Sequence, residues 1–579
     1  MPGCRVGAVH DLVIRGGTIV DGSGAPRRVG DVAIDGDRIA SADGTAGPGR
    51  REIDARGLLV TPGWVDIHTH YDGQATWDPY LTPSCWHGVT TVVMGNCGVG
   101  FAPARPDRHA WLIGLMEGVE DIPGTALAEG LRWSWETFPE YLTALESMPR
   151  ALDIAAQVPH GAVRAYVMGE RGAKNEPATA ADIAAMAAIV REGIAAGGVG
   201  FTTSRTMLHR AVDGEPVPGT YAAEDELLGI GRVLGELGRG VFELASDLMP
   251  EGKELAWMER LSAETRRPIT FACLQNDIDP MQWRRLLEAA ERAAAGGARV
   301  TPQIAARPTS LLLGLQTTAH PFISHAGYRE IAHLPLDERV RRLRDPEVRR
   351  RILGEQVQFE SAIAAFVATA FHKLFSLGDP PDYEPSPENS VAAIAERQGK
   401  RPEEIAYDLL LERDGRALLY LPLLNYSQSD FDPIREMLLH PLAVIGLADG
   451  GAHCGLICDA STPTFLLTHW VRDRHRGERL PLEFIVHRQT QETAALYDLH
   501  DRGLLAPGMK ADVNVIDLDA LSLAPPEMVF DLPAQGRRLI QKAKGYRATV
   551  KSGEVIFEDG EASGALPGKL LRGPQQPRA

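Results

Sequence analysis

The sequence has little of several features that would settle its class at once. Its 579 residues include only six cysteines, and aromatic residues make up 6%. No run approaches the roughly 18 apolar residues that a membrane helix needs, and the first residues contain neither an apolar stretch nor a small-residue cleavage site. The cysteine spacing indicates separate thiols rather than a disulfide framework. We expect a cytoplasmic protein with no membrane partner.

Positive charge is also in short supply. Lys and Arg number 60 against 77 Asp and Glu, a net charge of −17, which disfavours nucleic acid and anionic membranes as partners. The chain is 44% hydrophobic and 24% charged, as expected for a globular enzyme with a small-molecule substrate. Its length exceeds that of one ordinary domain and predicts a large domain with a smaller one.

Both ends of the chain have the alternating pattern of short β-strands. Residues 11–22, 31–34 and 57–60 alternate or cluster apolar residues between glycine turns, and residues 511–517 and 548–557 repeat this pattern. Neither end offers enough strands to bury a sheet face alone. We therefore predict one composite β-sandwich domain from residues 1–61 and 501–579.

The middle of the chain, residues 62–500, alternates short apolar runs with helical patterns. The candidate strands are residues 64–67, 90–94, 165–168, 200–202, 241–244, 269–271, 299–302 and 443–447. This is the count that an α/β fold of the (β/α)8, TIM-like barrel type needs. A charged, helix-rich stretch at about 325–440 predicts a helical insertion before the last barrel strand, as a wall over the barrel mouth.

The end of the first barrel strand carries His68 and His70. Residues i and i+2 of a strand share a face, so both imidazoles are expected in one small volume, as half of a site for a first-row metal such as zinc. The alternative is a pair of strand-end histidines that face solvent.

Cys97 and Asp449 follow two other predicted strands. Cys97 lies in the glycine-rich turn 95–100, where a thiol could lose its proton to a metal, or else be a small buried hydrophobe. Asp449 precedes Gly450-Gly451, where a carboxylate could transfer protons during catalysis, or else cap a turn. His453, four residues on, is either a substrate residue or a plain loop histidine.

These motifs together resemble the amidohydrolase superfamily, and within it the N-acyl-D-amino-acid deacylase (D-aminoacylase-like) branch. The likeness rests on residues 62–72, 95–98, 449–450 and 507–512, and it extends to 394–400 and 564–569, so it covers nearly the whole chain. It implies metal-dependent hydrolysis of an acyl–nitrogen (amide) bond. It also implies that His68, His70 and Cys97 are metal ligands, and that Asp449 is a ligand and the acid/base.

The resemblance fails at two positions. Relatives present one histidine from strand five and another from strand six, where it lies within Ser-His-Leu-Lys. In this chain, strand five (residues 241–247) contains no histidine, and strand six reads Ala272-Cys273-Leu274-Gln275. Cys273 then takes the ligand position, either as a sulfur ligand or as a core residue, and Gln275 takes that of a substrate-contacting lysine. We expect about one Zn²⁺ per chain, with another divalent metal as the alternative.

Further polar residues near strand ends are candidates for substrate binding. They are His160, Arg205, His209, Gln275, Gln303, Arg307 and His453. An arginine at a barrel mouth suits a bidentate grip on a substrate carboxylate, although arginines also tie loops together.

Three functions stay open at this point. The first is a metal-dependent amide hydrolase. The second is an enzyme on the same scaffold that opens a cyclic amide or cleaves a carbon–carbon bond next to a carbonyl. The third is a binding protein that has lost catalysis. The sequence names neither the acyl group nor the amine nor its handedness, and it leaves a homo-oligomer open.

Overall fold

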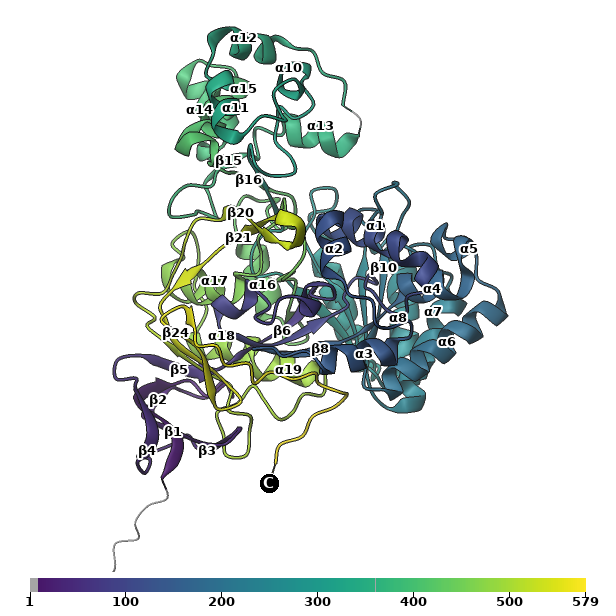
Figure 1. The fold of residues 1–579 in the computed structure, drawn as a ribbon, viewed down its shortest axis with the longest axis vertical. Coiled ribbons are helices and arrows are strands. Elements are labelled where there is room, and N and C mark those ends of the chain that lie inside the picture. Colours follow the sequence, from purple (N-terminus) through teal and green to yellow (C-terminus); the bar gives the residue numbers. More distant parts are fainter. Residues whose placement is uncertain (1–8, 360, 579) are drawn as a thin grey trace, which may run out of the picture.

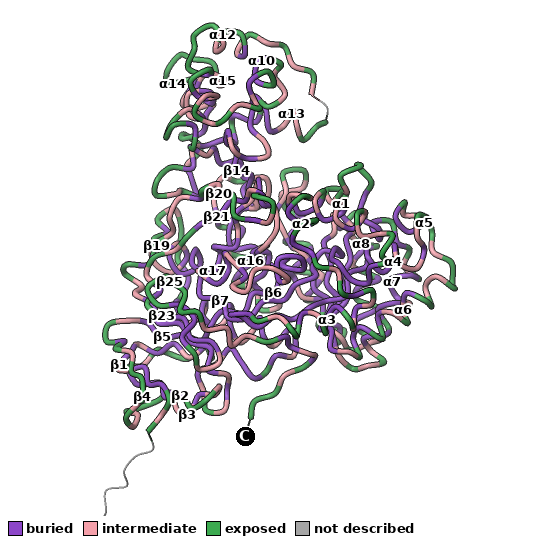
Figure 2. The backbone as a smooth tube through the Cα atoms, viewed as in Figure 1, coloured by how far each residue is buried: buried purple, intermediate pink, exposed green. Residues whose placement is uncertain are grey.

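The computed structural model describes residues 9–359 and 361–578. Figure 1 shows three regions: a β-layer at one end, a central body of strands and helices, and a lobe of helices that stands off from the rest. Figure 2 shows that the buried residues run continuously through the central body and into the β-layer. Among the described residues, none of the helices combines the length and apolarity that crossing a bilayer requires.

Strands from both ends of the chain share one nine-stranded sheet. It contains β1 (His10–Ile19), β2 (Arg28–Asp35), β3 (Arg38–Ser41), β4 (Gly49–Asp54), β5 (Leu59–Pro62), β18 (Val513–Ile516), β23 (Tyr546–Lys551), β24 (Glu554–Glu558) and β25 (Glu561–Ala562). The two ends meet where β5 pairs antiparallel with β18. Apolar side chains from both ends, such as Ile14, Val32 and Val550, form one cluster beneath this sheet.

The body contains two parallel sheets that continue one another. The first is β6 (Trp64–Thr69), β7 (Val89–Met94) and β8 (Asp153–Ala156); the second runs β9 (Val158–Pro159), β10 (Gly200–Arg205), β11 (Val241–Ser246), β12 (Ile269–Ala272), β13 (Val300–Ile304) and β17 (Val444–Ile445). Only Gln157 separates β8 from β9, and a parallel bridge between Thr69 and Gly450 links β6 to the residues after β17. The carboxyl ends of these strands therefore meet on one side of the body.

Helices cover the strands of the body. They are α1 (His109–Glu120), α2 (Gly124–Gly130), α3 (Phe138–Glu146), α4 (His160–Met168), α5 (Glu170–Ala173), α6 (Ala180–Ala195), α7 (Glu224–Leu237), α8 (Glu251–Thr265), α9 (Gln282–Ala295), α17 (Thr462–Phe465), α18 (Leu482–Gln489) and α19 (Gln491–Leu496). A strand followed by a helix recurs along the chain, as in an α/β fold.

One predicted strand is wrong. Residues 165–168 belong to helix α4, and the third parallel strand is β8. A short apolar run does not distinguish a strand from a buried helix by periodicity. In addition, β8 begins with Asp153, whose charge hides the strand in the sequence. The other predicted strands of the body overlap β6, β7, β10, β11, β12, β13 and β17.

The insertion is longer than predicted and has its own core. It occupies the chain between β13 and β17, and begins with β14 (Ser310–Leu313), which pairs with β16 (Leu419–Pro422) beside β15 (Phe375–Ser376). Its helices are α10 (Ala326–Arg329), α11 (Leu336–Leu343), α12 (Pro346–Gly354), α13 (Ala362–Thr369), α14 (Val391–Gln398) and α15 (Pro402–Leu410). The next helix, α16 (Asp432–Leu439), packs in the main apolar cluster of the body. Side chains such as Leu313, Tyr328 and Leu419 pack in a separate cluster, and Figure 1 shows α10 to α15 as the projecting lobe.

A buried ion network joins the body to the β-layer. Asp153 on β8 lies 2.7 Å from Arg502 and 3.0 Å from Lys551 on β23, and Lys551 lies 2.9 Å from Asp512. Burial alone would raise the pKa of Asp153, but the charges of Lys551 and Arg502 hold it well below its usual range. The stabilisation is therefore present above the ordinary carboxyl pKa and is lost as the pH falls through the lower pKa of the folded state.

We predict that Asp153→Asn lowers the free energy of unfolding at pH 7 by about 3–5 kcal/mol, because it leaves buried cations without part of their countercharge. Urea titration measures this. The matched control is Asp559→Asn, which breaks an exposed pair with Arg547 and should cost less than about 1 kcal/mol. Equal costs for the two variants would contradict the role of this network.

Candidate metal centre and active site

Two imidazoles come together at the carboxyl end of β6. His68 lies in the strand and His70 directly follows it, and each is 1% exposed. The rings are 5.4 Å apart at an angle of 66°. The loop after β17 fixes their backbone, because the Asp449 N–H donates to the His68 carbonyl (3.0 Å) and the His70 N–H to the Gly450 carbonyl (2.8 Å).

The turn after β7 brings the Cys97 thiol to the same place. Cys97 has a positive φ of 56°, and its N–H donates to Glu243 Oε2 at 2.9 Å, which holds this turn. Its Sγ lies 3.4 Å from His68 Nε2. Ligand atoms of His68, His70 and Cys97 all lie within 4.8 Å of one another, so these three residues could hold one metal ion.

Asp449 approaches both histidines from the loop after β17. Its Oδ1 is 3.4 Å from His68 Nε2 and 3.8 Å from His70 Nε2. Ligand atoms around a tetrahedral zinc ion are about 3.3–3.8 Å apart, since each lies about 2.0–2.3 Å from the metal. The spacing of these donors therefore fits a single first-row ion.

The outer nitrogen of each histidine faces a polar side chain. His68 Nδ1 is hydrogen-bonded to Gln303 Oε1 at 3.0 Å, and His70 Nδ1 lies 3.2 Å from Glu120 Oε1. Glu120 Oε2 also lies 3.6 Å from His453 Nε2. Such outer partners fix which nitrogen is free to bind a metal. Here they leave both Nε2 atoms directed at Asp449.

Sequence reasoning missed two buried carboxylates at this centre, Glu120 and Glu243. Glu120 ends α1, and Glu243 lies on β11 with Oε1 3.9 Å from His68 Nδ1. Both Glu120 oxygens and Glu243 Oε1 are buried without a hydrogen-bond partner. Glu120 has His70 and His453 as its ionic neighbours, and a cation at the centre would offset the cost of burying both carboxyl groups. The sequence signal for Glu243 was a charge within an apolar strand; Glu120 gave none.

Burial and neighbouring charges shift the pKa values of the centre. Burial lowers the pKa of His68 to about 4 and raises that of Glu243 to about 8. Burial would lower the pKa of His70 too, but Glu120 and Asp449 raise it to about 9. The pKa of the Cys97 thiol is raised well above its usual value by burial. A divalent cation would reverse this pattern, favouring a thiolate and neutral imidazoles.

Of the seven predicted substrate residues, the structure brings three to the centre: Gln303, which is hydrogen-bonded to His68, and His453 and His209. His453 lies beside Glu120, with its ring 6.5 Å from that of His70. His209 is bonded to Ser204 Oγ at 3.1 Å, at the end of β10, and Thr202 Oγ1 on the same strand accepts the Gly98 N–H of the Cys97 turn.

The other four have partners within the protein. His160 bonds to Thr203 and Glu226, and Arg205 forms a bidentate pair with Glu254. Gln275 accepts from the Ser427 N–H and donates to the Pro280 carbonyl. Arg307 pairs with Asp459 and lies over the ring of Tyr383. Their side chains are thus engaged in holding loops together.

Cys273 is separate from the three-residue group. Its side chain is fully buried in the main apolar cluster, and its N–H donates to the Gln303 carbonyl at 2.9 Å. Burial raises the pKa of its thiol to about 12. These surroundings favour the core residue over the sulfur ligand.

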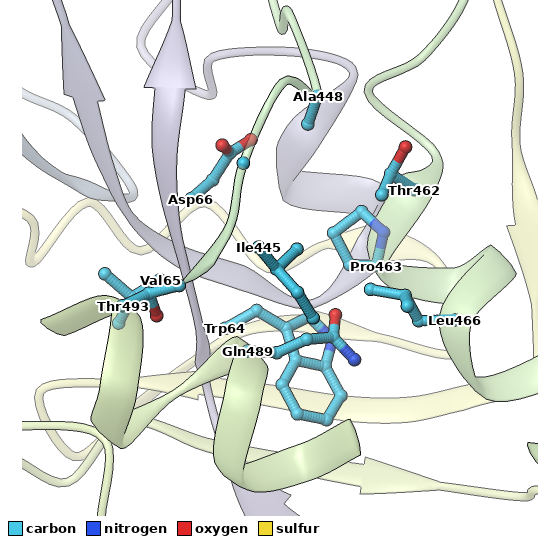
Figure 3. Close-up of a pocket in the computed structure, with 11 residues that line it drawn as sticks. Trp64, Val65, Asp66, Ile445, Ala448, Thr462, Pro463, Leu466, Gln489 and Thr493 are labelled. Atoms are coloured by element: carbon cyan, nitrogen blue, oxygen red, sulfur yellow. The ribbon is translucent and has the colours of Figure 1, made fainter. Parts of the chain in front are cut away.

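A small cavity lies beside β6, next to the centre. Figure 3 shows its lining, in which Asp66 and Gln489 are polar and Trp64, Ile445 and Leu466 are apolar. Asp66 Oδ1 accepts the His68 N–H at 3.1 Å, whereas Asp66 Oδ2 has no partner. Burial raises the pKa of Asp66 to about 7. Asp66 therefore supports the backbone of a metal-binding candidate from outside the centre.

We predict that Glu120→Gln weakens zinc binding by about 10–100-fold, because His70 loses the carboxylate that orients it. Competition with a chromogenic chelator measures the affinity. Glu129→Gln, on the exposed side of the neighbouring helix α2, is the matched control and should bind zinc normally. Normal affinity in Glu120→Gln would remove Glu120 from the centre.

Comparison with known proteins places this geometry in a family. A model described as "Amidohydrolase family" matches residues 51–557. The chain is 27% identical to an N-acyl-D-aspartate deacylase and 28% identical to an N-acyl-D-glutamate deacylase, both from Alcaligenes xylosoxydans xylosoxydans. Each alignment covers 97% of this chain, and 95% and 96% of the respective relatives.

Solved structures agree on the fold. A D-aminoacylase structure described in terms of its binuclear metal centre has a TM-score of 0.64 at 25% identity, over 97% of this chain and 100% of that one. An N-acyl-D-glutamate deacylase from Bordetella bronchiseptica, complexed with zinc and a phosphonate inhibitor, has a TM-score of 0.64 at 24% identity, over 98% and 100%. The resemblance predicted from the sequence is confirmed: the chain belongs to the amidohydrolase family and is similar to its N-acyl-D-amino-acid deacylases.

Proposed function

We propose that this chain is a metal-dependent hydrolase that cleaves the acyl C–N bond of an N-acyl amino acid. The observation that carries the proposal is the meeting of His68, His70, Cys97 and Asp449 at one buried point. The names of the full-length relatives, which are deacylases of N-acyl-D-aspartate and N-acyl-D-glutamate, support the substrate class.

The same residues would hold one divalent ion, and zinc suits their mixture of imidazole and thiolate. His68 and His70 would bind through Nε2 and Cys97 through Sγ, with Asp449 completing the set. When bound, the ion supplies Lewis-acid activation of water and of the amide carbonyl. Gln303 and Glu120 hold the two imidazoles in place, and Glu243 holds the Cys97 turn.

Asp449 is the proton-transfer group in this proposal. Its side chain is 15% exposed whereas the two histidines are 1% exposed, so it stands at the edge that a substrate reaches. The carboxylate accepts a proton from the attacking water and delivers it to the departing nitrogen. His453, which is 22% exposed, lies on the same side and is placed to contact the substrate.

The proposal includes finer points of architecture. We propose that the parallel strands close into a (β/α)8 barrel whose mouth holds the centre, since active sites of such barrels lie at the carboxyl ends of the strands. Residues 1–61 and 501–579 would form the composite β-domain, and residues 62–500 the barrel with its insertion. A cytoplasmic location and zinc as the native metal belong to the same proposal.

The first test combines elemental analysis with a panel of N-acyl-D- and N-acyl-L-amino acids. We expect about one zinc per chain and turnover on this panel. Cys273→Ser should retain the metal. If the protein holds metal but hydrolyses nothing on the panel, cyclic-amide opening or carbon–carbon cleavage is favoured. If it has neither metal nor turnover, a binding protein is favoured. Two full equivalents of metal would contradict the single-ion site.

A second prediction concerns Asp449. Asp449→Asn keeps the shape of the side chain and removes the base, so turnover should fall by about 10²–10⁴-fold with little change in the melting temperature. Steady-state kinetics at saturating zinc separates this loss from a loss of metal. Asp473→Asn, whose partner is the neighbouring Arg472, is the control. Near-normal turnover in a zinc-loaded Asn variant would remove Asp449 from proton transfer.

A further inference from the structure

Exposed apolar side chains gather on three consecutive loops of the body. Seven of the thirteen large apolar side chains that are exposed among the described residues lie on the loops after β10, β11 and β12. They are Met207, Leu208, Val212, Tyr221, Met249, Ile278 and Met281, which are 39–97% exposed. Solvent-exposed apolar residues scattered singly are ordinary, but several on neighbouring loops indicate a binding surface.

Polar contacts hold the first two of these loops together. The Tyr221 hydroxyl lies 3.3 Å from Met207 Sδ, and the Met207 N–H donates to Asp247 Oδ2 at 2.9 Å. Asp247 lies two residues before Met249, so the apolar side chains of the β10 and β11 loops are neighbours. Their backbone is fixed by hydrogen bonds, which makes the exposed side chains part of a formed surface.

The third loop joins through Arg285 on α9. Its guanidinium lies 3.0 Å from Glu251, which begins α8 just after Met249, and 2.5 Å from Asp279, which follows Ile278. We call Met207, Leu208, Tyr221, Met249, Ile278 and Met281 the apolar rim. Two acidic side chains adjoin the rim, Glu251 and Asp279, and Arg285 pairs with both. Neither of these carboxylates therefore adds an unpaired charge to the apolar surface.

The loop after β10 connects this rim to the metal centre. His209 directly follows Leu208, and its Nδ1 is bonded to Ser204 Oγ at 3.1 Å. The strand before this loop contacts the centre, because Thr202 Oγ1 on β10 accepts the Gly98 N–H of the Cys97 turn at 3.1 Å. The loop after β10 thus begins beside the Cys97 turn and carries the apolar side chains of Met207 and Leu208 in solvent.

We propose that the apolar rim binds the acyl group of the substrate, and that this group is a long aliphatic chain. The inference rests on the proposed function, because a scissile carbonyl held beside Asp449 extends its acyl group to one side of the mouth. A two-carbon acyl group ends near the centre, whereas a long one extends along the carboxyl ends of the strands, where the loops that carry the rim begin. The chain's net charge of −17 disfavours an anionic lipid surface as the occupant.

The experiment compares N-acetyl, N-butanoyl, N-octanoyl and N-dodecanoyl derivatives of the amino acids in the panel above, each below its critical micelle concentration. We expect kcat/KM to rise with chain length, by up to about fourfold for each methylene that becomes fully buried. A flat or falling series, with the acetyl derivative hydrolysed well, would overturn the inference and leave the proposed function standing. Failure to hydrolyse any derivative would overturn the proposed function itself.

Variants locate the effect on the rim. Leu208→Ser and Met249→Ser should each lower the dodecanoyl-to-acetyl ratio of kcat/KM by at least about fivefold, as burial of a leucine-sized side chain predicts. Val29→Ser and Phe530→Ser, at exposed apolar positions on β2 and on β20 (Glu527–Leu532), should keep the native ratio. An unchanged ratio in the rim variants would contradict the assignment. A shift from dimer to monomer in Ile278→Ser, with an unchanged ratio, would instead make the rim an interface between two copies.

Discussion

The structure depends on how four donor groups are buried at one point. The Nε2 atoms of His68 and His70, the Cys97 thiol and the Asp449 carboxylate come from three separate segments, and they face one another with little or no contact with water. Glu120 and Glu243 add buried carboxylates to the same volume. Such an arrangement is costly when empty and favourable around a divalent cation, so metal binding and the stability of this region are coupled.

The backbone around the centre follows from this requirement. Cys97, Asp449 and His453 all have positive φ, a conformation that residues other than glycine adopt at a cost. The β6 end and the loop after β17 hold one another through the Thr69–Gly450 bridge and two hydrogen bonds. The rigid strands fix the histidines, and the strained loops bring the thiol and the carboxylate to them.

Local patterns predicted some of the centre, and long-range contacts determined the rest. His68 and His70 were predictable because a strand repeats every two residues, and Cys97 and Asp449 because each follows an apolar run and lies among glycines. Glu120 was not, since a helix-end glutamate reveals nothing about the histidine it will face. Arg205 and Arg307 suggested substrate contacts, but only the fold shows that Glu254 and Asp459 engage them. The strand at β8 was missed because Asp153 finds its cations more than three hundred residues away, at Arg502 and Lys551.

The departure from relatives at strands five and six has a physical consequence. In place of a histidine, β11 offers Glu243, whose Oε2 is already used by the Cys97 N–H, and strand β12 leads to Cys273 in the apolar core. The ligands that remain support our proposal of a single ion. X-ray absorption at the zinc edge tests this most directly: the account predicts a sulfur at about 2.3 Å together with nitrogen and oxygen at about 2.0–2.2 Å, with the sulfur lost in Cys97→Ser. A zinc-loaded native protein without a sulfur neighbour would contradict it.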